Sequence, residues 1–193
     1  PIRSGSRAPT CIRRWRASWN RAKRWRKRCG GKCSRNPASG WVPDCFHDLL
    51  EYGYLASQRD PFDPIDKEIK NTTEKFLKNT EHIHDPWKLV REYPLSKHLL
   101  ALSHVWESSD RREHVIAAKG APEAIADLCH FTKEQTKELR IHVKEMADKG
   151  LRVLGVARSS FKEDFLPDKQ HDFEFDFVGL LGFVDPVRTT VAR

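Results

Sequence analysis

The chain has 193 residues, which is enough for one well-buried domain and some additional segments. Hydrophobic residues make up 38% and charged residues 32%, an ordinary balance for a soluble globular protein. The longest apolar run, residues 177–184, falls far short of the about 20 residues that a membrane span needs, and the first residues lack the apolar core of a secretory signal. Five cysteines are too few and too irregular for a disulfide scaffold, so we expect a reducing, cytoplasmic environment.

The charge divides the chain near Gly40. Residues 1–40 contain ten Arg, three Lys and no acidic residue, whereas residues 41–193 contain 22 basic and 27 acidic residues, which together give the net charge of +8. We therefore divide the chain into an Arg- and Trp-rich basic segment, residues 1–40, and one domain of ordinary size, residues 41–193.

The basic segment allows several interpretations. Arg and Trp interleave in residues 13–28, which would suit a nucleic-acid-binding protein or an anionic membrane surface. A disordered tail, or a stretch that is not native coding sequence, is favoured, because thirteen like charges with few aliphatic residues cannot offset the cost of ordering. We therefore do not expect a nucleic-acid partner. Cys29 and Cys33, with Cys45 and His47 further on, resemble a zinc motif only weakly.

Helix signals in the domain are local and specific. Asp63 followed by Pro64 predicts an N-cap and the first turn of a mostly exposed helix, and Thr132 with Gln135 predicts a capping box. Gly150 stands where a helix that begins at residue 133 would end. The predicted helices are residues 44–58, 64–79, 122–129 and 133–149.

Strand signals flank these helices. Alternating and β-branched runs predict strands at residues 89–94, 99–107, 113–118, 151–157 and 173–184, the second and third joined as a hairpin by a charged turn. The order of strands and helices predicts an α+β fold, a mainly antiparallel β-sheet flanked by helices.

The chain has few residues in patterns typical of catalysis. It contains no complete phosphate-binding glycine loop, no Gly-x-Ser-x-Gly and no His-Glu-x-x-His. His82 and His84 could touch a metal, but their spacing favours an exposed polar loop. We therefore predict no catalytic residue and no metal ligand. Lys119 and Gly120 remain, at a turn from a strand into the helix that Pro122 begins. A cation there could contact an anionic ligand or simply be solvated.

Four segments together resemble the nucleotide-binding domain of P-type cation pumps. They occur in the order found in that family and cover about residues 46–193. They are Arg59-Asp60-Pro61-Phe62-Asp63-Pro64, Lys119-Gly120-Ala121-Pro122-Glu123, the helix-Gly-Leu-Arg-strand segment at 146–157, and the strand at 177–188 that ends in Asp185-Pro186-Val187-Arg188. Residues 93–96 and 101–106 look more like a bacterial subgroup than the animal calcium pumps.

The resemblance implies a site for ATP, which binds with Mg²⁺ in the parent pump. Asp63 would stand near the adenine, Lys119 and Gly120 would line the pocket, and Arg152 would reach toward the phosphates. Asp185 and Arg188 would belong to the hinge and the phosphate side when the domain closes.

Two departures from the family pattern concern the base. Where the family has a stacking Phe and a Lys, this chain has Leu95 and Leu100. Losing the aromatic ring removes stacking worth about 0.5–1.5 kcal/mol. If side chains alternate along the strand, Tyr93 faces the same side as Leu95 and could substitute for the ring.

The family's Asp-Lys-Thr-Gly-Thr motif, which carries the phosphorylated Asp, does not occur in these 193 residues. The resemblance therefore implies an ATP-docking domain whose partners are the phosphorylation, actuator and transmembrane domains of a parent pump, at the cytoplasmic face of a membrane. Two alternatives stay open: a basic-armed nucleic-acid-binding protein, and a folded remnant that no longer binds nucleotide.

Overall fold

The computed structural model describes residues 33–36, 40–78, 80, 82–84, 87–108, 113–162 and 165–184. Its centre is an antiparallel sheet in which each strand pairs with the next one along the chain. The five strands, in order across the sheet, are β3 (Lys88–Tyr93), β4 (Ala101–Glu107), β5 (His114–Gly120), β6 (Leu151–Phe161) and β7 (Asp176–Val184). The predicted hairpin is therefore confirmed as β4 and β5.

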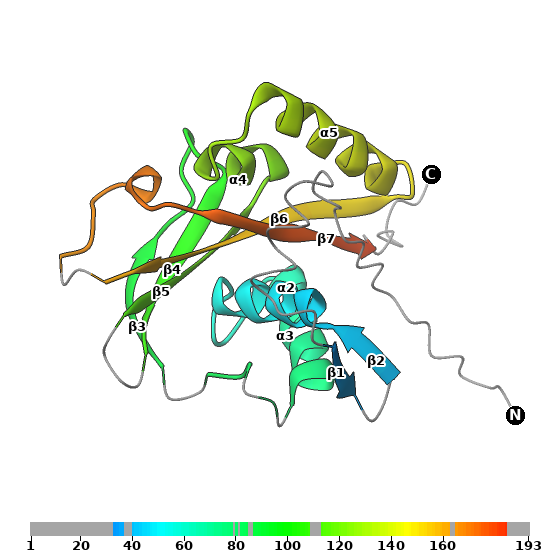
Figure 1. The fold of residues 1–193 in the computed structure, drawn as a ribbon, viewed down its shortest axis with the longest axis horizontal. Coiled ribbons are helices and arrows are strands. Elements are labelled where there is room, and N and C mark those ends of the chain that lie inside the picture. The colour runs from blue at the N-terminus through cyan, green and yellow to red at the C-terminus, as the bar shows by residue number, and fades with distance from the viewer. Residues whose placement is uncertain are drawn as a thin grey trace, which may run out of the picture.

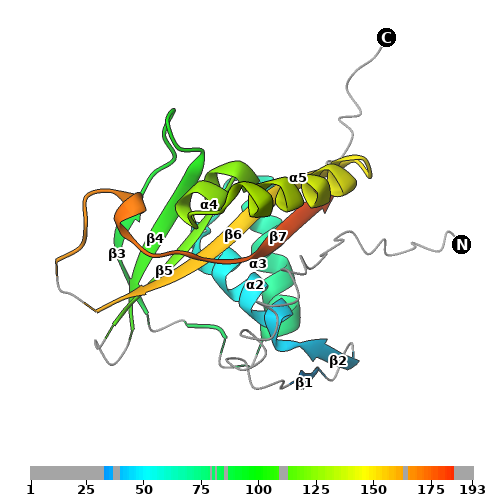
Figure 2. The ribbon, with the colours of Figure 1, turned by 45° about the horizontal axis from the view of Figure 1, so that its top comes forward.

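Helices cover both faces of this sheet (Figure 1). The first pair, α2 (Asp44–Leu55) and α3 (Pro64–Leu77), lies on one face, and the second pair, α4 (Pro122–Leu128) and α5 (Lys133–Ala147), lies on the other. Figure 2, with the ribbon turned, shows α4 and α5 in front of the sheet and α2 and α3 behind it. The predicted α+β architecture, an antiparallel sheet flanked by helices, is confirmed. None of the described helices has the length and apolar character needed to cross a bilayer.

Each face of the sheet has its own apolar core, because successive strand residues point to opposite sides. On the α4 side, Ile116 and Ala118 of β5 pack with Ile125 of α4 and with Phe173. On the α2 side, Val156 of β6 and Leu181 of β7 pack with Leu49 of α2 and Ile69 of α3. Any side chain can therefore be assigned to a face from its strand register.

Local capping chemistry sets the helix boundaries that the sequence predicted. The Asp63 carboxylate accepts a hydrogen bond from the Ile65 amide at 2.7 Å, which confirms it as the N-cap of α3. Thr132 and Gln135 form both bonds of the capping box of α5. Gly150 has a φ of 74°, the left-handed conformation expected after a helix end.

Some boundaries differ because tertiary contacts decide them. The helix predicted to reach residue 58 ends at Leu55, whose carbonyl oxygen accepts hydrogen bonds from the side chains of His104 and Trp106. β4 starts two residues later than predicted, since Ser96 and Leu99 form a turn. β6 extends to Phe161, and a short 3₁₀ turn, η1 (Gln170–Asp172), precedes β7.

The end of the basic segment contributes to a small hairpin, in which β1 (Cys33–Asn36) pairs with β2 (Gly40–Pro43). The predictions for residues 1–32 and 37–39, a disordered or non-native stretch with an alternative nucleic-acid role, lie outside the described residues. The same holds for Cys29 of the weak zinc pattern and for most of the charged turn after β4.

Candidate functional site

Lys119, the next-to-last residue of β5, is almost completely buried on the α2 side of the sheet. Its ammonium group donates a hydrogen bond to the Ser57 hydroxyl at 2.8 Å and forms an ion pair with Asp66 in the first turn of α3. The side chains of Lys119 and Asp66 are only 6% and 14% exposed. The Lys119 side chain, which the sequence placed at the turn from a strand into a helix, is therefore covered by the segment that joins α2 to α3.

Burial lowers the pKa of Lys119 from its ordinary value, because charging an amine away from water is unfavourable. Asp66, through its hydrogen bond and its charge, and Asp63, through its charge, oppose this effect. Asp63 is the N-cap of α3, three residues before the Asp66 that pairs with Lys119, so both predicted pocket residues are close to the start of α3.

The segment between α2 and α3 is fixed onto the sheet by its own contacts. The Leu55 carbonyl at the end of α2 accepts from the His104 ring at 3.0 Å and from the Trp106 indole at 2.9 Å. The Arg59 guanidinium lies 5.1 Å above the Trp106 ring and donates to the Trp87 carbonyl at 2.6 Å. These contacts fix the first part of the segment near the opposite end of β4, and the ion pair between Asp66 and Lys119 joins the start of α3 to the end of β5.

Five of the predicted site residues gather around that end, where β3 and β5 finish and β4 and β6 begin; we call it the Lys119 end. Gly120 is opposite Ala101 and Gly155 in the strand register. Leu95 follows β3 by two residues and is 57% exposed, and Arg152 is the exposed second residue of β6. Asp63 lies at the start of α3. Leu100, the other departure from the family pattern, is 53% exposed beside them.

Arg152 shares a sheet face with Lys119. Lys119 is opposite Val156 in the register, and opposite residues point to the same side. Arg152 precedes Val156 by four residues on the same strand, so its side chain points to that side as well. At about 3.3 Å per residue, the backbone position of Arg152 lies about 13 Å along the strand from that of Val156, the residue opposite Lys119.

Gly120 is required by the close approach of two strands. A Cβ atom on Gly120 would lie 2.3 Å from the Leu100 carbonyl oxygen and 2.6 Å from the Ala101 Cα atom. The next amide, Ala121, donates to the same Leu100 oxygen at 2.8 Å. Gly120 therefore allows β5 to turn into α4 directly beside the start of β4.

Tyr93 lies apart from this group. It is 5% exposed, packs edge-on against Phe173 in the core of the α4 side, and its hydroxyl donates to the Pro167 carbonyl. Its register partner is Ser103, which is opposite Ala118 and not Lys119. The structure therefore does not bring Tyr93 onto the face of Lys119. Asp185 and Arg188 lie outside the described residues.

Ser57 and Asp66 are the neighbours of Lys119 that sequence reasoning missed. They precede Lys119 by 62 and 53 residues, and no spacing rule connects positions so far apart. The one local signal was the position of Asp66 in the first turn of α3, where a carboxylate favours the helix dipole by itself.

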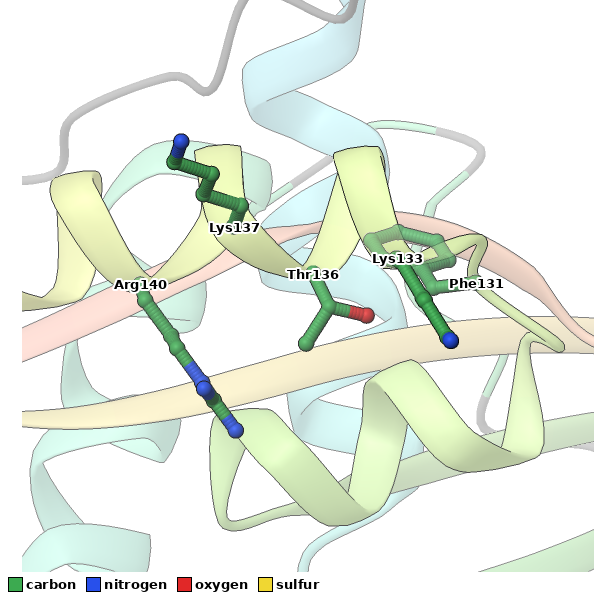
Figure 3. Close-up of a pocket in the computed structure, with 5 residues that line it drawn as sticks. All are labelled: Phe131, Lys133, Thr136, Lys137 and Arg140. Atoms are coloured by element: carbon green, nitrogen blue, oxygen red, sulfur yellow. The ribbon is translucent and has the colours of Figure 1, made fainter.

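A shallow hollow of about 390 Å³ lies on the other side of the molecule, between α4 and α5. It is lined by Phe131, Lys133, Thr136, Lys137 and Arg140. Figure 3 shows Lys133 and Arg140 extending toward α4, whereas Lys137 extends away from it. None of the predicted nucleotide residues contributes to this hollow.

The expectation of an exposed polar loop at His82 and His84 is wrong. The two side chains are only 23% and 18% exposed, and both rings hydrogen-bond the carboxylate of Glu51 on α2, at 2.6 and 2.8 Å. Burial raises the pKa of Glu51, but its hydrogen bonds with His82 and His84 and the charges of both rings outweigh burial, so the net pKa lies below the ordinary value. Glu51 is too distant in sequence for the spacing of the histidines to reveal it.

Comparison with known proteins identifies the domain. Residues 63–190 match the family described as the cytoplasmic domain N of P-type ATPases. A sodium/potassium-transporting ATPase subunit alpha-1 from Catostomus commersonii is 32% identical over 147 residues, covering 64% of this chain and 13% of that protein. A sodium/potassium exporting P-type ATPase from Schizosaccharomyces pombe is 31% identical over 110 residues, covering 52% of this chain and 10% of that protein.

A putative cation-transporting ATPase from Methanocaldococcus jannaschii is 28% identical over 141 residues, covering 73% of this chain and 16% of that protein. The relatives found include animal, yeast, archaeal and bacterial proteins, so the resemblance to a bacterial subgroup stays a prediction. The chain spans less than a fifth of the length of each of the three relatives named above. With its antiparallel sheet, flanking helices and four motifs in family order, the chain belongs to the P-type ATPase family, in which it corresponds to the cytoplasmic N domain.

Proposed function

We propose that this domain docks ATP at the Lys119 end of the sheet and presents the γ-phosphate to an Asp outside this chain. The observation that carries the proposal is the placement of Asp63, Lys119 and Arg152. The fold brings these three residues, far apart in sequence, to one face and one end of the sheet. In such a complex, catalysis consists of positioning and charge stabilisation.

Each residue of the group would have a distinct task. Arg152, exposed and always charged, would neutralise phosphate oxygens. Lys119 would hold the start of α3 in place through Asp66 and add a positive charge beneath the ligand. Leu95, half-exposed at the same end, would offer an apolar surface to the base. Tyr93 is left out of this proposal because its ring lies in the core of the opposite face.

Mg²⁺ would arrive with the triphosphate. The carboxylates nearest to Lys119 already have partners within the protein, Asp63 at the N-terminus of α3 and Asp66 at Lys119. The phosphorylation, actuator and transmembrane domains of a parent pump would be its partners, and cation transport would belong to the whole pump.

A titration of the full chain with ATP and with adenosine, followed by amide chemical shifts, tests this proposal. We expect saturable shifts at the start of α3, at the end of β5 and at the start of β6. Arg152→Ala should weaken ATP binding several-fold and leave adenosine binding unchanged, because in the proposed complex this side chain would contact phosphate and not the nucleoside. Arg140→Ala, an equally exposed change in the hollow between α4 and α5, is the matched control.

Two results would overturn the proposal. A folded chain whose shifts stay constant at millimolar ATP is the non-binding remnant that the sequence left open. Equal weakening by Arg152→Ala and Arg140→Ala would mean that ATP binds through unspecific charge, and the basic segment of residues 1–40 would then become the first region to test with nucleic acid.

A further inference from the structure

The α2 side of the molecule contains a partly buried cluster of side chains of the types that bind metal ions. Asp48 and Glu51 are three residues apart on α2 and so lie on one face of the helix. His82 follows α3 and lies against them. One ligand atom from each of Asp48, Glu51 and His82 can be chosen so that all three lie within 4.8 Å of one another.

The cluster is enclosed by protein. The side chains of Asp48, Glu51 and His82 are 17%, 10% and 23% exposed, so they are not an acidic patch on an open surface. A carboxylate as buried as that of Glu51 is uncommon unless it is paired or binds a metal. Glu51 contacts two imidazole rings at once, His82 through one carboxylate oxygen and His84 through the other.

The donor set suits a small divalent transition metal. Zn²⁺ binds imidazole nitrogen and carboxylate oxygen at about 2.0–2.2 Å, so neighbouring ligand atoms of a tetrahedral site are roughly 3.3 Å apart. The Glu51 oxygen and the His82 Nδ1 are 2.6 Å apart, with a proton between them. To hold the ion in place of that proton, the Glu51 oxygen and the His82 Nδ1 would move apart by roughly 0.7 Å. A carboxylate oxygen of Asp48 lies within 4.8 Å of both atoms and would supply the third ligand.

Neighbouring side chains hold these ligands in place. His84 bonds the other oxygen of Glu51 and is itself stacked on Trp87, with ring centres 3.7 Å apart. Arg158 of β6 bonds one oxygen of Asp48 at 3.2 Å. Carboxylate ligands of metal sites are characteristically oriented by such outer hydrogen bonds.

We propose that Asp48, Glu51 and His82 bind a divalent transition metal ion, with Zn²⁺ as the preferred ion, and that His84 is a positioning residue for Glu51. Three protein ligands leave a further position for water. The ion would join α2 to the segment after α3 and would stabilise their contact. This site is independent of the proposed nucleotide site and stands or falls separately from it.

The test is Zn²⁺ and Co²⁺ binding to the full chain, measured by calorimetry and by the shift of the melting temperature. We expect one equivalent to bind and to raise the melting temperature. His82→Ala should remove this binding, and His84→Gln should weaken it by about 10- to 100-fold, as the loss of an outer partner does. His171→Ala is the matched control, because His171 contacts one carboxylate, Asp127, at 2.9 Å, and the two belong to no group of three potential ligands among the described residues.

The cysteines are the competing source of metal binding, and Co²⁺ distinguishes them. Thiolate ligands give an intense near-ultraviolet charge-transfer band, whereas imidazole and carboxylate ligands do not. A bound cobalt spectrum dominated by that band, or metal binding that His82→Ala leaves unchanged, would overturn the proposal. If His82→Ala fails to fold, amide shifts of the unaltered chain decide: perturbation centred on α2 supports the site, and its absence there refutes it.

Discussion

The Lys119–Asp66 ion pair allows a quantitative test of the packing at the Lys119 end. With side chains 6% and 14% exposed, the pair belongs with buried ion pairs, in which removal of one partner costs about 3–5 kcal/mol. Asp66→Asn should cost about 3 kcal/mol, because it removes the negative charge that is paired with the buried Lys119 ammonium. Lys119→Met should cost less, about 2 kcal/mol, because the N-terminus of α3 compensates the Asp66 carboxylate by up to about 1 kcal/mol.

The double variant Lys119→Met with Asp66→Leu should be within about 1 kcal/mol of the unaltered chain, because replacing both charges by apolar groups leaves no charge buried without a partner. Urea unfolding of the unaltered chain, Lys119→Met, Asp66→Leu and the double variant at pH 7, with equal slopes, closes a cycle that gives the coupling between the two positions. Asp66→Asn is measured beside them. If each single substitution lowers the free energy of unfolding by less than about 0.5 kcal/mol, the Lys119–Asp66 pair behaves as a solvent-exposed ion pair. Losses that simply add in the double variant would refute the reasoning that the two charges are buried against each other.

Three further predictions concern neighbouring residues. Leu95→Phe should tighten ATP binding by about 2- to 12-fold, the equivalent of about 0.5–1.5 kcal/mol of aromatic stacking. The control Ile141→Phe, on the exposed face of α5, should leave the dissociation constant for ATP unchanged. Equal effects of the two substitutions would contradict a base contact at Leu95. Gly120→Ala should lower the free energy of unfolding by about 1–3 kcal/mol in urea, since the new methyl group would displace the Leu100 backbone, and an unchanged midpoint would contradict this. Burial lowers the pKa of His104 more than the hydrogen bond to the Leu55 carbonyl raises it. The folded chain therefore binds fewer protons than the unfolded chain, and the free energy of unfolding decreases as the pH falls below about 6.5. The slope should approach about 1.4 kcal/mol per pH unit between the two pKa values and should flatten in His104→Gln. An imidazole NMR titration of His104 with a midpoint above 6.5 would contradict it.

The sequence predicted the elements best where local chemistry decides them. The N-cap of Asp63, the capping box of α5 and the left-handed Gly150 depend on neighbours within a few positions, and all three are confirmed. The hairpin of β4 and β5 followed from alternating side chains around a turn. These signals were sufficient for the fold class because each strand pairs with the next one along the chain.

The parts of the site that sequence reasoning missed depend on long-range contacts. Nothing near Lys119 in the sequence indicates Ser57 or Asp66, and nothing near His82 indicates Glu51. Tyr93 illustrates a different limit. Alternation suggested that it shares a face with Leu95, but the register places its ring on the face opposite to Lys119, against Phe173. The sheet face toward which a strand-end side chain points is set by its packing against distant parts of the chain, which local alternation does not reveal.

The strand order also has a consequence for how the chain folds. Most pairings in the sheet join strands that a short connection separates, so they close small loops and form quickly. The exception is β5 with β6, between which residues 121–150 and both α4 and α5 are inserted. Closing that longer loop has the larger entropic cost, so we expect the folding barrier to lie at the pairing of these two strands. Substitutions there would change the folding rate, whereas those at the edge strand β3 would act mainly on unfolding.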